Sequence, residues 1–403
     1  ENVLVRNATI WTEGPQGVLQ NADLLVRRGT IVEVGQNLSA PSGAVVIDAT
    51  GKHVTPGLVD PHVHSGIDGG TNETGGAIVP EVRIEDVLTM DNIWAYRQLA
   101  GGLTTAHILH GSANPIGGQN ATMKMRWGAL PKDQIFQAAP VTIKFALGEN
   151  VKRSEGRYPD TRMGTEEIIR DSFMAALDYR RAWEAWEEAG EGIPPRKDLR
   201  METLLDILDG KLPIHAHGYR ADEILMLMKL ADEFGLKIQV FIHAVEGYKV
   251  AEDLREYGAA AMVWTDWGSF KVESYDATTY NAEILREAGV FTTLHSDDSQ
   301  LSSRMNWEAG KLLRTGISAE DALAMVTLIP ATVLEVQDRV GSLEAGKDAD
   351  FVIWSGDPLS TSTIAQQTWV DGRRYFDIDE DREARQEVER ERAMLIQRIL
   401  EQR

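Results

Sequence analysis

The feature of this sequence that most restricts its fold is a series of metal-binding residue types placed at the ends of apolar runs. His62 and His64 close one such run, and the period of two in an extended strand sends both imidazoles to one face. His215 and His217 follow a second run at the same spacing, and His243 ends a third. Buried imidazoles need partners, and neutral imidazoles on one face form half of a metal site. The pattern therefore favours a sheet whose strand ends meet in one place.

Apolar strand patterns alternate with helical patterns from residue 53 onward, which is typical of βα units and a parallel sheet. The clearest helices each precede a glycine in the position of a left-handed C-cap, and they span 221–234, 249–257 and 282–288. Barrel strands are predicted at 57–63, 103–109, 121–126, 141–147, 212–216, 238–243, 259–264 and 290–296. This number of strands closes a (β/α)8 TIM-like barrel, in which chemistry lies at the carboxyl ends of the strands.

The two ends of the chain carry a different pattern. Short β-rich runs occupy residues 1–52, and complementary strands return near 349–354 and 368–375. The stretch 152–211 is too long for an ordinary βα connection, so we expect it either to pack on the barrel exterior or to form a lid or dimer arm. The predicted domains are a small β domain from 1–52 and 332–376, a metal-binding barrel from 53–331 and a charged C-terminal helix from 377–403.

Composition limits the partners and the metal ligands. The net charge of −21 argues against nucleic acid, whose phosphates demand clustered Lys and Arg. No apolar run reaches the ~18 residues of a membrane span. Because the chain has no cysteine, a metal must be held by nitrogen and oxygen. We expect a small-molecule substrate and a homo-oligomer. The chain starts at Glu1 and lacks an initiator Met, and exported proteins lose their signal peptide. Both a cytoplasmic and an exported location are therefore open.

Four stretches together carry a resemblance to a known family. They are V-D-P-H-V-H at 59–64, I-H-A-H at 214–217, V-F-T-T-L-H-S-D at 290–297 and the closing R-V-G-S-L-E-A-G-K-D-A-D-F-V-I at 339–353. On these stretches the chain resembles a metal-dependent hydrolase of the amidohydrolase superfamily, nearest its imidazolonepropionase-like and prolidase-like branch. The resemblance implies that both termini meet as one small β-sandwich beside the barrel.

The resemblance also implies a ligand set. At the end of the fifth predicted strand, it favours His215 over His217 as the metal ligand, with His217 contacting the substrate. After the eighth predicted strand, it assigns Asp297 rather than Asp298 to the metal and to proton transfer. Because Asp297 is the expected general base, it is the predicted catalytic residue. The implied metal ligands are His62, His64, His215, His243 and Asp297.

Strand four decides how many ions bind. Alternation along 142–147 sends Lys144 into the barrel, where a charged side chain is costly unless it has a role. In relatives a lysine at this place is carbamylated and bridges two metals, and in other branches a glutamate bridges instead. Glu149 stands higher on the strand, and Gly148 can supply a bulge that turns it inward. We favour Glu149 as the bridge and keep Lys144 as a bridging or supporting residue.

Other polar residues after the strands are candidates for substrate binding: His217, Tyr219, Arg220 and Gln119. An arginine there can hold a carboxylate by a bidentate fork. The sequence contains no G-x-S-x-G elbow and no Walker or dinucleotide motif, so a serine hydrolase and a nucleotide-binding enzyme are unsupported.

We therefore expect a hydrolase that uses one or two divalent ions, zinc above all, and attacks an amide or cyclic-amide C–N bond with metal-activated hydroxide. A mononuclear imidazolonepropionase- or deaminase-like hydrolase is the alternative within enzymes. A non-catalytic barrel that serves as a binding or scaffold protein is the alternative of another class. The identity of the substrate depends on the loops after the strands, which cannot be interpreted without geometry.

Overall fold

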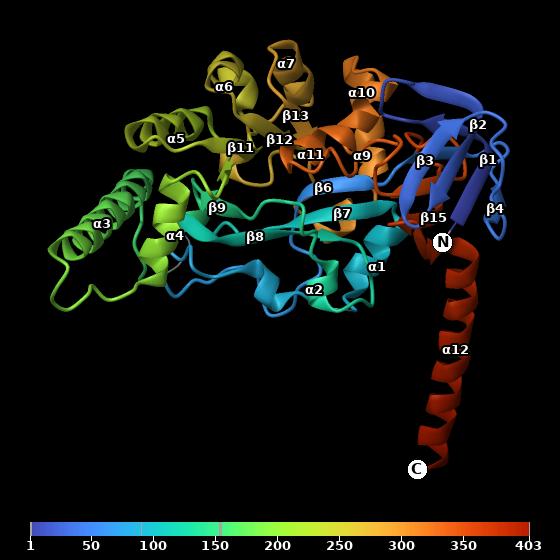
Figure 1. Cartoon of the computed structure of the whole chain (residues 1–403), viewed down its shortest axis with the longest axis horizontal. Coiled ribbons are helices and arrows are strands. Elements are labelled where there is room, and N and C mark those ends of the chain that lie inside the picture. The colour runs from blue at the N-terminus through green and yellow to red at the C-terminus, as the bar shows by residue number, and fades with distance from the viewer. Residues whose placement is uncertain (1, 90, 153–154, 403) are drawn as a thin grey trace.

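The computed structural model describes residues 2–89, 91–152 and 155–402, and it contains two large sheets. One sheet forms the barrel, and the other is built from both ends of the chain (Figure 1). Each strand predicted for the barrel overlaps an observed strand. The barrel strands, which are neighbours in this order, are β6 (Leu58–Val63), β7 (Leu103–Ile108), β8 (Ile116–Lys124), β9 (Thr142–Ala146), β10 (Ile214–Gly218), β11 (Ile238–His243), β12 (Ala260–Val263) and β13 (Thr292–Leu294).

The third barrel strand departs from the predicted parallel arrangement. β8 runs antiparallel to both of its neighbours, β7 and β9, whereas the other barrel pairs are parallel. Only residues 109–115 separate β7 from β8. A parallel crossover needs a dozen or more residues, so this short link permits a hairpin and not a βα unit. The prediction of an all-parallel sheet is therefore wrong at β8.

The gap between the first and last barrel strands is bridged by the chain itself. Leu294 N donates to Met325 O at 3.1 Å, and Val59 N donates to Val326 O at 2.9 Å. The segment 325–326 thus lies between β13 and β6. The result is a nearly closed eight-stranded barrel within a mixed α/β fold.

Helices cover the outside of the barrel (Figure 1). Two predicted C-caps are confirmed, because Gly235 and Gly258 adopt left-handed φ values of 68° and 84°. The helices are α1 (Ile93–Ala100), α2 (Pro131–Gln134), α3 (Arg162–Ala189), α4 (Leu199–Leu208), α5 (Ala221–Phe234), α6 (Ala251–Tyr257), α7 (Asn281–Glu287), α8 (Ser299–Ser302), α9 (Met305–Lys311), α10 (Ala319–Ala324) and α11 (Leu328–Val333). Short 3-10 turns lie at Ile84–Val87, Asn150–Lys152, Gly247–Val250, Val272–Ser274 and Leu312–Thr315.

The long connection between β9 and β10 forms α3 and α4, which project from one end of the molecule (Figure 1). The first half of α3 buries Ile169, Phe173 and Ala176. The ring of Phe173 stacks 6.2 Å from that of Phe145 on β9, so this half packs on the outer face of the barrel. This contact agrees with the prediction of external packing.

Both ends of the chain contribute strands to the terminal sheet. β1 lies at its centre and pairs along one edge with β4 through residues 3–6 and with β5 through residues 9–10. The two termini were predicted to form one small β domain together, and they do contribute to one sheet. That this domain is a β-sandwich stays a prediction. The strands are β1 (Asn2–Trp11), β2 (Val18–Arg27), β3 (Thr30–Gly35), β4 (Val45–Asp48), β5 (His53–Pro56), β14 (Phe351–Trp354), β15 (Ala365–Val370) and β16 (Arg373–Asp377).

A buried ion cluster joins the terminal sheet to the barrel. Lys124, at the end of β8, is fully buried. Its Nζ lies 3.0 Å from an oxygen of Asp348, 2.7 Å from one of Asp350 and 3.0 Å from one of Asp371. These carboxylates flank β14 and the β15–β16 turn. Because removal of one partner leaves a buried charge uncompensated, the cluster fixes the position of the sheet on the barrel.

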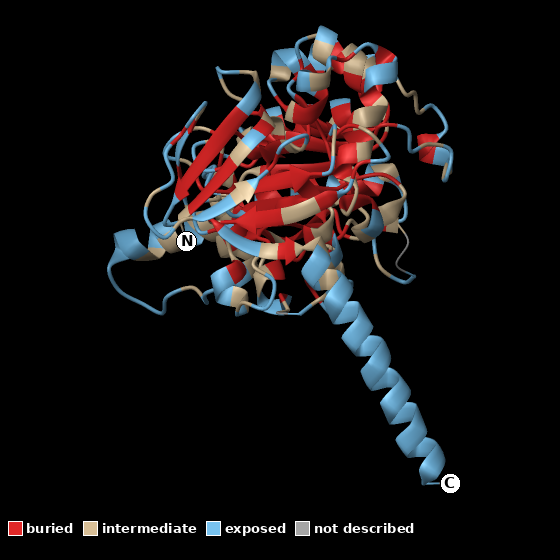
Figure 2. Ribbon diagram, turned by 90° about the vertical axis from the view of Figure 1, so that its right-hand side faces the viewer, coloured by how far each residue is buried: buried red, intermediate tan, exposed pale blue. Residues whose placement is uncertain are grey.

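The C-terminal segment forms the predicted charged helix. α12 (Ile378–Glu401) contains no buried residue and extends away from the body of the molecule (Figure 2). Its large apolar residues from Val388 to Leu400 are exposed to solvent in this structure. Among the described helices, none combines the length and the apolar character that a membrane crossing requires.

Candidate active site

Four side chains from three separate parts of the chain converge at the carboxyl ends of the barrel strands. Asp297 Oδ1 lies 3.0 Å from His64 Nε2 and 3.6 Å from His62 Nε2. Its other oxygen lies 3.7 Å from His243 Nε2. His62 and His64 come from the end of β6, His243 ends β11, and Asp297 follows β13. One carboxylate surrounded by three imidazoles at these distances is the arrangement expected of ligands around an ion.

The backbone at two of these residues adopts an uncommon conformation. His243 and Asp297 have positive φ values of 72° and 54°, which residues with a Cβ rarely adopt. Asp297 N also donates to His62 O at 2.9 Å, which joins the two strand ends. Such backbone strain persists where the surrounding structure imposes it, and it is concentrated at functional sites.

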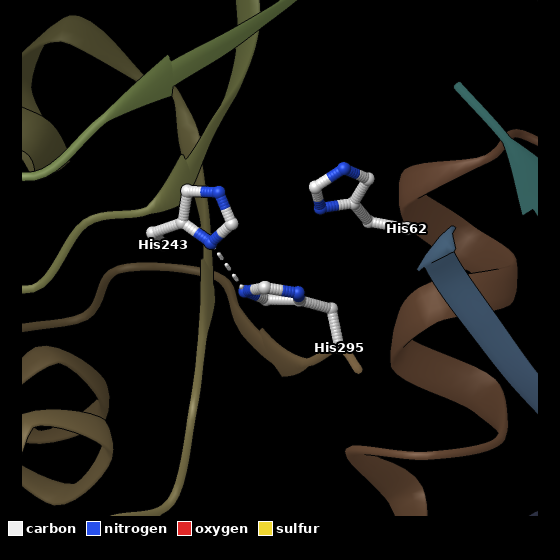
Figure 3. A group of neighbouring side chains, drawn as sticks. All are labelled: His62, His243 and His295. Carbon is white, nitrogen blue, oxygen red and sulfur yellow. Dashed lines mark hydrogen bonds between the residues drawn. The ribbon is translucent and has the colours of Figure 1, made fainter. Parts of the chain in front are cut away.

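Hydrogen bonds select the nitrogen that each imidazole presents. His64 Nδ1 lies 2.8 Å from Leu109 O, and since a carbonyl only accepts, Nδ1 carries a proton and Nε2 is the nitrogen that faces Asp297. His243 Nδ1 lies 3.2 Å from His295 Nε2 (Figure 3). The other ring nitrogen, His243 Nε2, lies 3.7 Å from Asp297 Oδ2. The ring of His62 faces this pair (Figure 3).

Burial keeps the rings of His62, His243 and His295 neutral. Burial, together with neighbouring cations, holds the pKa values of His62 and His243 well below the usual range. Burial likewise lowers the pKa of His295 to about 3 and the pKa of Lys144 to about 7. A neutral imidazole is the form that binds a metal.

The donor atoms fit a divalent ion. His243 Nε2, the nitrogen that faces Asp297, is buried and makes no hydrogen bond within the described part of the chain. Two triads hold ligand atoms within 4.8 Å of one another, and they share His62. The first is His62, His64 and Asp297, and the second is His62, His243 and His295. Imidazole nitrogen with one carboxylate oxygen is a donor set that suits zinc and similar ions.

Lys144 lies at this group, whereas Glu149 lies at the rim. Lys144 is fully buried on β9, with Nζ 3.1 Å from His62 Nε2. The side chain of Glu149 is 41% exposed, and its oxygens lie 2.9 Å from Lys152 Nζ and 3.0 Å from Arg162 Nη2. Gly148 does adopt a positive φ of 76°, but the turn it makes directs Glu149 toward these cations rather than toward the histidines.

The two histidines of β10 have different surroundings. The ring of His217 lies 4.7 Å from the ring of His243 and 5.0 Å from that of Tyr219, so the structure brings His217 to the site. His215 is one side-chain layer further from the carboxyl end of β10. Its Nε2 lies 2.8 Å from Gln239 Oε1, and its ring neighbours His107.

The remaining candidates divide between the site and the rim. Tyr219 is buried, with its ring 4.9 Å from that of His243. Arg220 pairs with Asp222 at 2.9 Å, and Gln119 donates to Pro80 O at 3.2 Å, so neither is brought to the histidines. Asp298 caps α8 by accepting a hydrogen bond from Leu301 N at 2.7 Å.

Comparisons with known proteins identify the family of the chain. A crystal structure of an amidohydrolase from Thermotoga maritima MSB8 has 34% sequence identity and a TM-score of 0.86, and the match covers 93% of this chain and 100% of that one. The chain belongs to the amidohydrolase family. The family profile, described as Amidohydrolase family, matches residues 251–380 of this amidohydrolase.

Two curated relatives extend the comparison. Amidohydrolase tasK of Hapsidospora irregularis is 32% identical over 422 residues; the match covers 93% of this amidohydrolase but 43% of tasK, so the chain spans less than half of that relative. The imidazolonepropionase of Alkaliphilus metalliredigens (strain QYMF) is 24% identical, with 84% of this chain and 85% of the relative covered. These relatives support the imidazolonepropionase-like part of the resemblance.

Asp60 is a residue of the site that the sequence interpretation missed. In this amidohydrolase it is fully buried and accepts hydrogen bonds from His62 N and Ser296 N, both at 3.2 Å, from Ser302 Oγ at 2.7 Å and from the Ser296 hydroxyl. Burial raises its pKa to about 6. The carboxylate thus ties β6 to the segment that carries Asp297. The sequence did contain a signal for this role: an acidic residue lies inside an otherwise apolar strand. A buried carboxylate requires hydrogen-bond partners, so Asp60 could have been expected to hold neighbouring segments together.

Replacement of Asp60 by alanine is expected to loosen this tie. The Asp60→Ala protein should lose about 3 kcal/mol of unfolding free energy, because several buried donors lose their acceptor. It should also bind zinc about 10–100-fold more weakly, because the ligand histidines lose their orientation. Denaturant unfolding and zinc titration measure the two effects.

Asp23→Ala is the matched control. Asp23 is also buried, and it accepts hydrogen bonds from Asn7 N at 3.0 Å and Leu38 N at 2.9 Å in the terminal sheet. This variant should lose stability but keep its zinc affinity. Equal zinc affinities in the Asp60→Ala protein and the unaltered protein would contradict a positioning role for Asp60.

Proposed function

We propose that this amidohydrolase is a metal-dependent hydrolase that cleaves an amide or cyclic-amide C–N bond. The observation that carries the proposal is the approach of His62, His64 and His243 to the carboxylate of Asp297, at 3.0–3.7 Å, where barrel chemistry is located. The imidazolonepropionase relative acts, by its name, on an imidazolone ring, and this supports a C–N bond as the target.

We propose a ligand set that departs from the sequence-based set at two places. His217 replaces His215 as the ligand of β10, because its ring lies 4.7 Å from that of His243 while His215 is bonded to Gln239. Lys144 replaces Glu149 as the bridging residue, because its Nζ lies 3.1 Å from His62 Nε2. The other proposed ligands remain His62, His64, His243 and Asp297.

The charge at Lys144 must change for this role. Its amine gains a negative charge by addition to carbon dioxide, with formation of a N–C bond and release of one proton, and the resulting carbamate can lie between two cations that otherwise repel. Full burial favours the neutral amine that this addition requires.

The chain's own groups then have distinct tasks. A divalent ion held by these ligands would supply Lewis acidity, which polarises a carbonyl and lowers the pKa of water to about 7. Asp297 accepts the proton of the attacking water and returns it to the departing nitrogen. Asp60 holds β6 and the segment after β13 in register through its hydrogen bonds to His62 N and Ser296 N. The buried Tyr219 closes the wall beside His217 and His243.

A substrate screen tests the proposal. Zinc-loaded protein is incubated with N-acyl amino acids, dipeptides and cyclic amides, and released amine or opened ring is quantified. We expect hydrolysis of at least one class, at a rate that falls at least ~100-fold in the Asp297→Asn protein, because a general base contributes about 10²–10⁴. Hydrolysis that persists in Asp297→Asn at the same rate would indicate a contaminant. Absence of hydrolysis in all three classes by zinc-loaded protein counts against the proposed function.

A further inference from the structure

We infer that a cavity beside His243 binds an uncharged aromatic ring of the substrate. This inference rests on the proposed function and names a substrate class for it. The cavity has a volume of about 180 Å³ and lies between the loop that follows β12 and residues 277–281. Its lining includes His243, Trp264, Asp266, Trp267, Thr278 and Thr279.

The cavity opens directly on the candidate metal ligands. The imidazole of His243 is both a lining residue and a neighbour of Asp297, with Nε2 3.7 Å from Oδ2. The indole of Trp264 stacks on His243, with ring centroids 4.3 Å apart and planes 22° apart. A group bound in the cavity is therefore attached to, or close to, the bond at the metal site.

The lining combines polar residues with two tryptophans, Trp264 and Trp267, and Trp264 is fixed in place. Trp264 Nε1 donates to Ser296 O at 2.9 Å, which holds the indole against the site. Trp267 stacks on Trp264 with centroids 5.5 Å apart and planes 27° apart, and Phe270 meets Trp264 edge-on at 5.9 Å and 83°. Aromatic faces and edges placed in this way attract another ring in an offset-stacked or edge-to-face geometry.

The size of the cavity indicates one ring. A cavity of about 150 Å³ holds benzene, whereas a pocket for a whole drug-sized ligand spans about 300–1,000 Å³. At about 180 Å³ the cavity accepts one group of a substrate and not the whole molecule. The scissile bond would remain at the metal site.

The charges around the cavity favour an uncharged group. Asp266 is the charged carboxylate among the described lining residues, and its oxygens lie 3.1 Å from Lys311 Nζ and 3.2 Å from Arg314 Nη2. Lys311 also pairs with Glu308 at 2.8 Å. Carboxylates and cations are thus balanced, and the cavity offers no excess charge to an ionic substituent.

The aromatic part of the lining is partly uncovered, as a substrate-binding surface would be. Trp267, which lines the cavity, is 37% exposed in the free protein, and Phe270, which packs edge-on against Trp264 behind the lining, is 53% exposed. Clustered exposed aromatic residues mark sites where a ligand or partner binds. A bound ring would cover Trp267, which makes this residue the informative one to change.

Binding of benzamide and acetamide tests the inference without requiring turnover. Both are uncharged amides, and they differ in the ring. Zinc-loaded protein should bind benzamide at least tenfold more tightly than acetamide, as measured by titration calorimetry. The Trp267→Ala protein should lose about tenfold in benzamide affinity and keep its acetamide affinity and zinc content. Thr279→Trp, which fills the cavity, should also lose benzamide binding while it retains zinc.

Trp127→Ala is the matched control, because Trp127 is also 37% exposed and packs on Tyr96 beside α1, away from the cavity. Its benzamide affinity should equal that of the unaltered protein. Equal affinities for benzamide and acetamide, or unchanged benzamide affinity in both Trp267→Ala and Thr279→Trp, would overturn the inference. If either of these results is found while the protein still hydrolyses an amide, the aromatic subsite is rejected and the proposed function is kept. Selective benzamide binding without hydrolysis of any amide rejects the proposed function and leaves the subsite supported.

Discussion

Removal of metal should reduce amide hydrolysis to the uncatalysed background, and added zinc should restore it. In the proposed mechanism His62, His64, His243 and Asp297 hold an ion, and without that ion neither the water nor the carbonyl would be activated at neutral pH. The protein is treated exhaustively with a chelator, its metal content is measured by elemental analysis, and the hydrolysis rate is measured before and after zinc is returned. The rate should follow the metal content at each step.

A pair of histidine variants controls this result. His243→Gln removes a proposed ligand and should abolish recovery on zinc addition. His53→Gln removes a half-buried histidine of β5 whose Nδ1 accepts a hydrogen bond from Trp11 Nε1 at 2.9 Å, and it should recover fully. Full activity in protein that elemental analysis finds free of metal would refute metal dependence.

The Lys144→Ala protein should lose one of two bound ions and most of its activity. The side chain is fully buried at 3.1 Å from His62 Nε2, so its removal takes away the proposed bridge between the two cations, which otherwise repel. Elemental analysis of the unaltered and variant proteins counts the ions. Acetate or propionate with added zinc should restore part of the activity, because a short carboxylate can occupy the place of the carbamate.

Glu149→Gln is the matched control for this prediction. Its side chain lies at the rim in ion pairs with Lys152 and Arg162, so the variant should keep both ions. Loss of an ion in Glu149→Gln together with full occupancy in Lys144→Ala would return the bridging role to Glu149. A single ion per chain in the unaltered protein would favour the mononuclear alternative.

The convergence of the main ligands could be predicted because it depends on local rules. His62 and His64 are two residues apart in a strand, and His243 and Asp297 end or follow apolar runs. Parallel strands bring their carboxyl ends to one edge, so such residues meet whatever the details of the loops. The direction of β8 was predicted incorrectly because the expected strand began too late, at residue 121, and this concealed the short link from β7.

The sequence alone could not decide between similar candidate residues. His215 and His217 share one face of β10, and which of them approaches His243 depends on how far the strand extends toward its carboxyl end. The direction of Glu149 depends on the backbone conformation at Gly148, and a glycine permits turns in either sense. Asp60 and Trp264 gain their roles from partners more than 30 residues away, Ser296 in both cases, and no local pattern reports such contacts.

The pairing of β5 with β14 affects how the protein is made. Residues 53–56, which lead directly into the ligand strand β6, pair with residues 351–354. On a translating ribosome the first of these strands emerges long before its partner is synthesised, and until then it presents an open edge of the kind that promotes aggregation. A nascent chain that stops short of residue 351 should therefore hold neither a finished terminal sheet nor firmly seated His62 and His64. Acquisition of metal is expected to be a late event in biogenesis, after release of the completed chain.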